Sequence, residues 1–207
     1  MINMNRKMQD YPINSYYRMK IRALGYHEAG HYIASRLLGF KAGSLKFKIL
    51  GVYGEHVGGS RIEPIRSLYS VNDILNYLEA RVQILYAGAL AESLSGRKVD
   101  EDIAVNILEE GGGQNDFAKA RELIHVIRNI RYPNSTDKLD LKKGLDKIND
   151  ELWDKAKLLV EEEHHLICGL GVRLESEINA VGEEFVLSED ELDSLPSIKE
   201  RFSKKTI

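Results

Sequence analysis

The chain has 207 residues, of which 43% are hydrophobic and 29% are charged. A chain of this length and composition can bury a core as one domain, so general disorder is excluded. Its 29 basic and 32 acidic residues give a net charge of -3, which provides no overall basic field for a phosphate backbone. We therefore do not expect nucleic acid as the main partner.

The termini and the cysteine content indicate a reducing compartment. The single cysteine, Cys168, excludes an internal disulfide. Residues 1–17 are polar and lack the apolar segment of a secretory signal. The longest nearly apolar stretch, residues 84–91, is much shorter than the roughly 18 residues that would cross a bilayer. We expect a soluble, cytoplasmic protein with no membrane span, made of a tail or arm at residues 1–20 and one domain at residues 21–207.

The first predicted elements are a helix and a small β-ribbon. Helical periodicity indicates a helix over residues 26–38, and Gly39 is suited to the left-handed position at its end. Apolar and basic residues alternate over residues 45–49, which is typical of a strand. The glycines that follow predict a turn into a second short strand near residues 61–62; they are Gly51, Gly54, Gly58 and Gly59.

The rest of the chain is predicted to be mainly helical. A helix should begin after Ser70, with Asp73 completing a capping box, and run to Ser95, and its segment 84–91 is apolar on every side and should be buried. After the break at residues 111–113, an apolar stripe indicates an amphipathic helix; it consists of Phe117, Ala120, Ile124 and Ile127. Residues 131–140 are predicted to form a loop.

Two further helices are expected near the C-terminus. One should start near Ile148 and be kinked or ended by Gly169 and Gly171, and the last should start at Ser188, with Glu191 completing a second capping box. The acidic residues 183–193 are interpreted as a solvated turn and a helix start. The predicted fold class is mainly α, a helical array with a small β-ribbon.

The segment YHEAGH at residues 26–31 carries the HExxH pattern. Histidines at i and i+4 lie one turn apart on the same helix face, so His27 and His31 can bind one divalent metal ion. The carboxylate of Glu28 would then stand where it can take a proton from a metal-bound water. This arrangement is typical of zinc peptidases, whose activated water attacks a peptide carbonyl.

A catalytic zinc site needs a third protein ligand. A metzincin would have a histidine ten residues after the first, but this position is Leu37. A thermolysin-like enzyme would use a glutamate on a following helix, whereas Glu55 and Glu63 fall in the predicted ribbon. Asp116 is the better candidate, because it follows the glycine run and stands in the first turn of a helix, where the dipole favours an anion.

Three segments resemble the peptidase domain of the FtsH family of ATP-dependent zinc proteases, in the same order and at about the same spacing. They are YHEAGHYIASRLLG (residues 26–39), ILYAGALAESLSG (84–96) and EGGGQNDFAKARELI (110–124). The resemblance extends over residues 22–195 and implies a mainly α fold with a short β-ribbon. It also implies that His27, His31 and Asp116 bind Zn²⁺, that Glu28 is the catalytic base, and that the substrate is a polypeptide.

This chain departs from the family in its second motif. The family usually has two glycines and then two glutamates where this chain reads AGALAES at residues 87–93, so one acid is lost. Glu92 remains, near the C-terminus of a buried helix, where the dipole and desolvation disfavour its charge. We hypothesise that Glu92 accepts a hydrogen bond from a ligand histidine, and pairing with an arginine is the alternative.

The sequence also contains no GxxxxGK[ST] phosphate loop, so the ATPase that accompanies FtsH-type peptidases is not expected in this chain. The expected substrates are therefore peptides, disordered tails or loosened proteins. A separate ATPase or adaptor partner and a homo-oligomer both remain options. An extended substrate is expected to pair with the ribbon edge near residues 58–62 by strand addition.

Two other functions stay open at the level of the sequence. A regulatory HExxH peptidase of the ImmA/IrrE type would not need Asp116 as a ligand. A catalytically silent FtsH-like adaptor or binding module would not need Glu28, whose presence argues against it. Among the remaining candidates, His56 is interpreted as a solvated loop histidine and Cys168 as a buried thiol.

Overall fold

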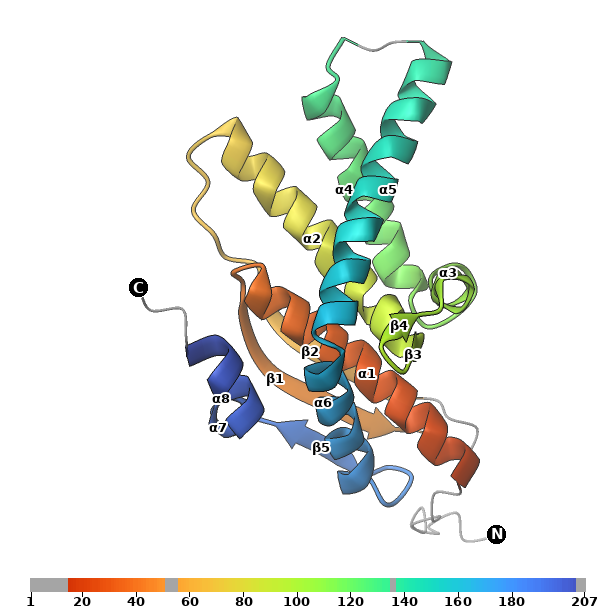
Figure 1. Cartoon of the computed structure of the whole chain (residues 1–207), viewed down its shortest axis with the longest axis vertical. Helices are drawn as coiled ribbons and strands as arrows, with labels where there is room; N and C mark the ends of the chain where they lie inside the picture. Colours follow the sequence, from red (N-terminus) through yellow and green to blue (C-terminus); the bar gives the residue numbers. More distant parts are fainter. Residues whose placement is uncertain (1–14, 51–55, 135–136, 204–207) are drawn as a thin grey trace, which may run out of the picture.

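The computed structural model describes residues 15–50, 56–134 and 137–203, and this part of the chain is mostly helical (Figure 1). The helices are α1 (Ser15–Leu37), α2 (Val71–Glu92), α3 (Glu101–Glu109), α4 (Gln114–Arg131), α5 (Lys138–Glu162), α6 (His164–Glu177), α7 (Glu189–Ser194) and α8 (Pro196–Ser203). The strands are β1 (Lys41–Ile49), β2 (His56–Glu63), β3 (Leu94–Ser95), β4 (Lys98–Val99) and β5 (Glu184–Leu187). The predicted mainly α class with a small β element is confirmed.

Helix α1 packs along α2 on one side and along α6 on another (Figure 1). Small residues allow the close approach to α2, since a Cβ atom on Gly30 would lie 2.4 Å from the carbonyl oxygen of Ala87. Gly25 and Gly171 do the same for α6, because a Cβ on Gly25 would lie 2.9 Å from the Gly171 backbone. The two contacts fix α1 firmly in the core, and the HExxH segment lies on this helix.

The larger sheet is antiparallel with the order β2-β1-β5, so β1 is central and β2 is an edge strand. Alternate residues of β1 are buried in the core: Leu45, Phe47 and Ile49. Phe47 lies opposite Gly58, and Leu45 lies opposite Ser60. Within the described residues no strand pairs with the outer edge of β2.

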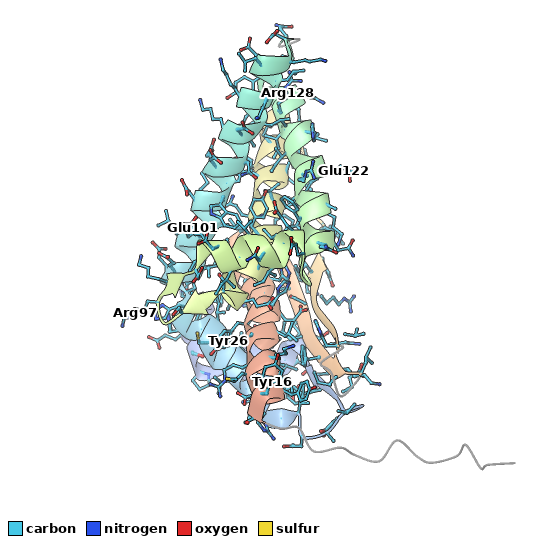
Figure 2. The ribbon with its side chains drawn as sticks, turned by 90° about the vertical axis from the view of Figure 1, so that its right-hand side faces the viewer. Tyr16, Tyr26, Arg97, Glu101, Glu122 and Arg128 are labelled. Carbon is cyan, nitrogen blue, oxygen red and sulfur yellow. The ribbon has the colours of Figure 1, made fainter. Side chains whose placement is uncertain are left out.

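The α4–α5 pair extends away from the sheet and packs against α2 (Figure 1). Figure 2 shows α3 lying crosswise to α1, α4 and α5. The turn from α3 to α4 is tight, because a Cβ atom on Gly111 would lie 2.9 Å from the backbone of Ile107. This turn places the first residues of α4, including Asp116, beside α1.

Several predicted helix boundaries are confirmed. Gly39 has the left-handed φ of 78° directly after α1. Ser70 caps α2 by accepting a hydrogen bond from the backbone N–H of Asp73, and Ser188 forms a capping box with Glu191 at α7. The segment 84–91 is buried throughout, as its composition predicts.

Other boundaries are wrong in the sequence analysis. Helix α1 begins at Ser15 rather than residue 26, so residues 15–20 are helical instead of a tail. Helix α2 ends at Glu92, because the chain turns into the β3–β4 hairpin at Gly96, whose φ is 65°. Helix α5 begins at Lys138 rather than near residue 148, since Asp137 caps it there.

The C-terminal half differs from prediction in two further ways. The break between α5 and α6 falls at Glu163, and α6 runs straight through Gly169 and Gly171. Strand β5 falls in the acidic segment that was interpreted as a turn, because Leu187 is buried and the strand pairs with β1. The predicted arm at residues 1–14 and the glycines at 51 and 54 lie outside the described residues. None of the described helices has both the length and the apolar character that a bilayer crossing requires.

Candidate metal centre

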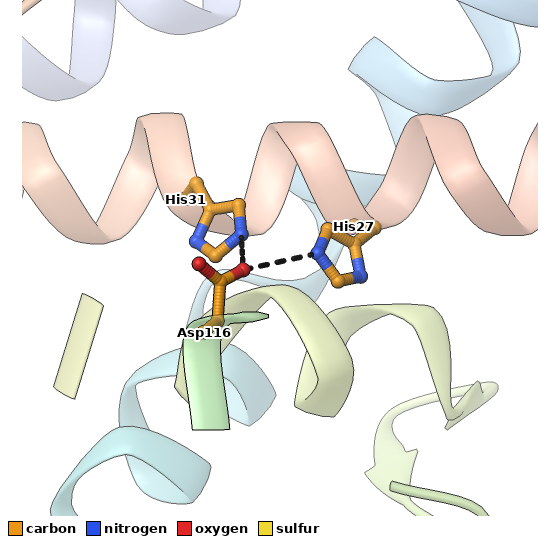
Figure 3. Close-up of side chains that lie close together, drawn as sticks. All are labelled: His27, His31 and Asp116. Carbon is orange, nitrogen blue, oxygen red and sulfur yellow. Dashed lines mark ion pairs between the residues drawn. The ribbon is translucent and has the colours of Figure 1, made fainter. Parts of the chain in front are cut away.

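The HExxH histidines lie side by side on α1 and face the first turn of α4 (Figure 3). His27 and His31 are each only 9% exposed. The Nε2 atom of His31 lies 3.1 Å from Oδ2 of Asp116, and the Nε2 atom of His27 lies 3.8 Å from the same oxygen. The structure therefore brings together the three residues that the sequence selected as metal ligands.

The residues of this cluster are close enough together to bind a metal ion. The three ligand atoms lie within 4.8 Å of one another. Two ligands at zinc–nitrogen and zinc–oxygen bond lengths in a tetrahedral site are about 3.3 Å apart, which lies between the two distances measured to Asp116. Gly88 of α2 leaves the space open, because a Cβ atom there would lie 2.5 Å from Nε2 of His31 and 2.6 Å from Nε2 of His27.

The second nitrogen of each histidine is held by α2. Nδ1 of His27 lies 2.8 Å from Oε2 of Glu92, and Nδ1 of His31 lies 2.8 Å from the backbone oxygen of Ile84. With a proton on each Nδ1, both Nε2 atoms present a lone pair toward Asp116. The predicted contact of Glu92 with a histidine of the HExxH segment is confirmed, and no arginine pairs with Glu92 among the described residues.

The charges of the cluster are strongly coupled. Burial by itself lowers the pKa of His27, but the hydrogen bonds with Asp116 and Glu92 outweigh burial and raise the pKa to about 9. Burial of Asp116 disfavours its carboxylate, but hydrogen bonds with His27 and His31 hold the pKa of Asp116 well below its usual range. The site thus keeps an ionised carboxylate next to the imidazoles. In this arrangement a cation can take the place of a proton.

Glu28 stands next to the ligands and faces the sheet. It is half-buried, and a Cβ atom on Gly58 of β2 would lie 2.6 Å from its Oε1 atom. The absence of a side chain at Gly58 therefore gives the carboxylate its place between α1 and the edge strand. Glu28 also lines the cleft between these elements.

A cleft of about 570 Å³ runs between α1, β2, α2 and the start of α4. Its walls contain the two HExxH histidines, Glu28, Asp116 and most of β2, including His56, Ser60 and Ile62. Other lining residues include Leu24, Arg81, Leu85, Gly112, Asn115 and Lys119. The cluster is thus open on the side of the edge strand. A volume of this size is typical of ligand-binding clefts.

Two candidates from the sequence have different environments from those expected. His56 lies in β2 rather than in a solvated loop. Its ring stacks on that of Phe47 with a centroid separation of 5.9 Å, and the residue lines the cleft. Cys168 is half-buried in α6, and burial raises the pKa of its thiol despite a hydrogen bond with Tyr26. The cleft residues Ser60 and Arg81 and the role of Gly88 were not predicted, since only the packing of α2 and β2 on α1 brings them to the site.

The fold and the site define a mainly α protein with a buried His-His-Asp cluster that can hold a metal ion. Comparison with models of known protein families finds no match for this chain, and a search of curated proteins finds no significant similarity to it.

Proposed function

We propose that this chain is a zinc-dependent metallo-endopeptidase, resembling a free-standing FtsH-type peptidase domain, that hydrolyses unstructured or loosened polypeptides. One observation carries the proposal: His27, His31 and Asp116 converge in an open cleft, with Glu28 beside them and an unpaired strand edge along one wall. A structural metal site would be closed by four protein ligands, whereas three ligands and an open side are typical of catalytic zinc.

When bound, zinc supplies a water of lowered pKa and polarises the carbonyl of the bond to be cleaved. Glu28 is placed to act as general base and then as general acid. Its carboxylate takes the proton of the attacking water and later delivers it to the leaving amine. Glu92 and the Ile84 carbonyl keep the two imidazoles in the orientation in which Nε2 faces the cation.

The substrate backbone is proposed to pair with the outer edge of β2. This edge lies against the cleft, and Gly58 and Gly59 give a peptide close access to it. Strand addition holds a peptide in an extended form beside Glu28, which also explains why folded proteins would be poor substrates. A structure with a non-cleavable peptide should show backbone hydrogen bonds to β2, and a peptide that contacts only helices would contradict this placement.

The position of Asp116 bears on the alternative enzymes. A regulatory peptidase of the ImmA/IrrE type would not need this residue, so its approach to 3.1 Å from His31 supports the FtsH-like ligand set. A separate ATPase or adaptor that delivers substrates is part of the same proposal, since an unstructured peptide must reach the cleft.

The experiment is a metal analysis combined with cleavage of casein and of short peptides by the native chain and by Glu28→Gln. We expect about one zinc ion per chain in both proteins and cleavage by the native chain alone. Asp116→Asn should lose zinc. Bound zinc without any Glu28-dependent cleavage would instead favour the catalytically silent binding module, and failure to bind zinc would overturn the proposal.

A further inference from the structure

Two polar atoms in the wall of the cleft have no hydrogen-bond partner among the residues that the structure describes. They are Nη1 of Arg81 on α2 and Oγ of Ser60 on β2, and both atoms are buried. Within the described part of the chain no carboxylate forms an ion pair with Arg81. A buried donor without an acceptor costs free energy, so a charged group in this position indicates that something else supplies the acceptor.

Arg81 lies at the end of the cleft beyond His31. Helix α2 runs antiparallel to α1, since Glu92 contacts His27 and the Ile84 carbonyl contacts His31. Arg81 is almost one turn before Ile84 in α2, so it is displaced from the metal ligands towards the C-terminal end of α1. A group bound by Arg81 would therefore lie a short distance from the metal centre, on the His31 side.

Ser60 reaches the same end of the cleft from the opposite wall. Gly58 faces Glu28, and Ser60 is two residues further along β2, so it lies on the same face of the strand. Ile62, on the same face again, pairs with Ala42 close to the C-terminal end of α1. A peptide paired with β2 and reacting beside Glu28 would thus have a neighbouring residue between Ser60 and Arg81.

The guanidinium of Arg81 is supported by an aromatic ring. Its Cζ atom lies 5.9 Å from the centroid of the Phe40 ring, and Arg66 lies over the same ring at 4.7 Å. Arg66 also donates a hydrogen bond to the Leu38 carbonyl, whereas Arg81 has no hydrogen bond within the described residues. Of these two cations, Arg81 is the one that lines the cleft and has a buried donor without an acceptor in the described part of the chain. A planar guanidinium matches a carboxylate with two parallel hydrogen bonds.

We propose that Arg81 and Ser60 form a subsite for a carboxylate of the peptide substrate, within one or two residues of the bond that is cleaved. The carboxylate belongs to an aspartate or glutamate side chain or to the C-terminus of the chain. This inference rests on the proposed peptidase function and adds the substrate class. Arg81 determines specificity by pairing with the acid, and the Ser60 hydroxyl donates a second hydrogen bond to it.

The test measures peptide binding to the Glu28→Gln protein loaded with zinc, using fluorescence anisotropy. The probes are fluorescein-labelled peptides that differ only by Glu or Gln at each position, with the C-terminus amidated or free. We expect the best glutamate peptide to bind about 10-fold more tightly than its glutamine partner, the gain typical of a hydrogen bond to a charged group. A gain from the free C-terminus alone would identify the terminal carboxylate as the source.

Variants separate this role from a structural one. Arg81→Gln, made in the Glu28→Gln protein, should abolish the ratio between the glutamate and glutamine peptides, and Arg81→Lys should restore part of it. Ser60→Ala should reduce the ratio by a few-fold. The matched control is Arg97→Gln, since Arg97 is exposed in the β3–β4 hairpin away from the cleft lining (Figure 2) and its loss should leave the ratio unchanged.

The outcomes are decisive in each case. Equal binding of both peptides to the Arg81-containing protein overturns the subsite, and so does an Arg97→Gln effect as large as that of Arg81→Gln. If Arg81→Gln does not fold, the Arg81→Lys and Ser60→Ala ratios decide in the same way. Cleavage by the native chain without acid preference would remove the subsite alone, whereas acid-selective binding without any cleavage would retain the subsite and remove the peptidase function.

Discussion

The carboxylate of Glu92 contacts the imidazole of His27, with 2.8 Å between Oε2 and Nδ1. Both side chains are largely removed from solvent, because only 18% of the Glu92 side chain and 11% of the His27 side chain are exposed. An acid in this position fixes the tautomer of the imidazole and increases its basicity towards a cation at Nε2. Glu92 at the end of α2 therefore has a defined structural role, because it holds the imidazole of His27 in one orientation.

Replacing Glu92 tests whether its contact with His27 contributes to metal binding. We expect Glu92→Ala to weaken zinc binding by about 10- to 100-fold, because the imidazole loses the acceptor that orients it. Glu92→Gln should have a smaller effect, since its amide oxygen can still accept the hydrogen bond. The measurement is a zinc titration against a competing chelator. Unchanged affinity in both variants would show that the Ile84 contact to His31 is sufficient to arrange the site.

Gly88 provides a steric test of the same centre. A Cβ atom at this position would lie 2.5 Å from Nε2 of His31 and 2.6 Å from Nε2 of His27, in the space the cation would occupy. We expect Gly88→Ala to abolish stoichiometric zinc binding while the far-ultraviolet circular dichroism spectrum stays helical. The readout is the zinc content after dialysis.

Gly169 is the matched control for Gly88. Both glycines are inside helices, but a Cβ on Gly169 of α6 would meet no atom within 4 Å. Gly169→Ala should keep the zinc content of the native chain and gain up to about 1 kcal/mol in free energy of unfolding from helix propensity. Full zinc binding by Gly88→Ala would contradict the placement of the cation between the two histidines.

The sequence predicted which three side chains cluster better than it predicted the bounds of the elements that carry them. His27 and His31 follow from helical spacing, whereas the position of Asp116 in the first turn of a helix makes it only a candidate. The resemblance of residues 110–124 to the third FtsH-type motif was needed to place Asp116 with the histidines. Local rules also identified the caps at Ser70 and Ser188. Short polar motifs have strong local signals, and this is why they could be found without tertiary information.

The unpredicted parts depend on contacts between distant segments. Strand β5 forms in an acidic stretch only because β1 offers it an edge, and Leu187 then enters the core. Helix α6 continues through Gly171, where it packs closely against α1. Tyr26 of α1 lies so near that a Cβ on Gly171 would be 2.2 Å from its ring. Gly88 and Arg81 reach the site only because α2 packs against α1. The apolar pattern of a single helix does not predict which other helix it packs against.

An ion-pair network between α4 and α5 should make stability depend on pH. Arg131 donates a hydrogen bond to Glu151 at 2.9 Å and Lys155 donates another at 2.6 Å. The hydrogen bond from Arg131, followed by that from Lys155, outweighs burial and lowers the pKa of Glu151 from 4.5 to about 2. Because the pKa is lower in the folded state, the stabilisation is complete above the unfolded value and is lost as the pH falls towards 2.

We expect Glu151→Gln to lower the free energy of unfolding by about 1 kcal/mol at neutral pH, since partial exposure screens the pair. The difference should shrink when urea unfolding is repeated below about pH 4.5. Asp146→Asn is the control, because Asp146 is exposed on the same helix and forms no ion pair within the described residues. A Glu151→Gln difference that is constant over the whole pH range would contradict the linkage.

Gly58 and Gly59 are neighbours in β2 and allow the general base to be tested without changing it. A Cβ atom on Gly58 would lie 2.6 Å from Oε1 of Glu28, whereas one on Gly59 would meet no atom within 4 Å. The added methyl group of Gly58→Ala should push the Glu28 carboxylate out of its position, and a displaced base typically costs 10²-fold or more in turnover.

Zinc content of Gly58→Ala should remain that of the native chain, because the proposed ligands lie on α1 and α4. Gly59→Ala should have a much smaller effect on turnover in the same peptide assay. Equal losses in the two variants would indicate that the strand, rather than the position of Glu28, is what the methyl groups disturb.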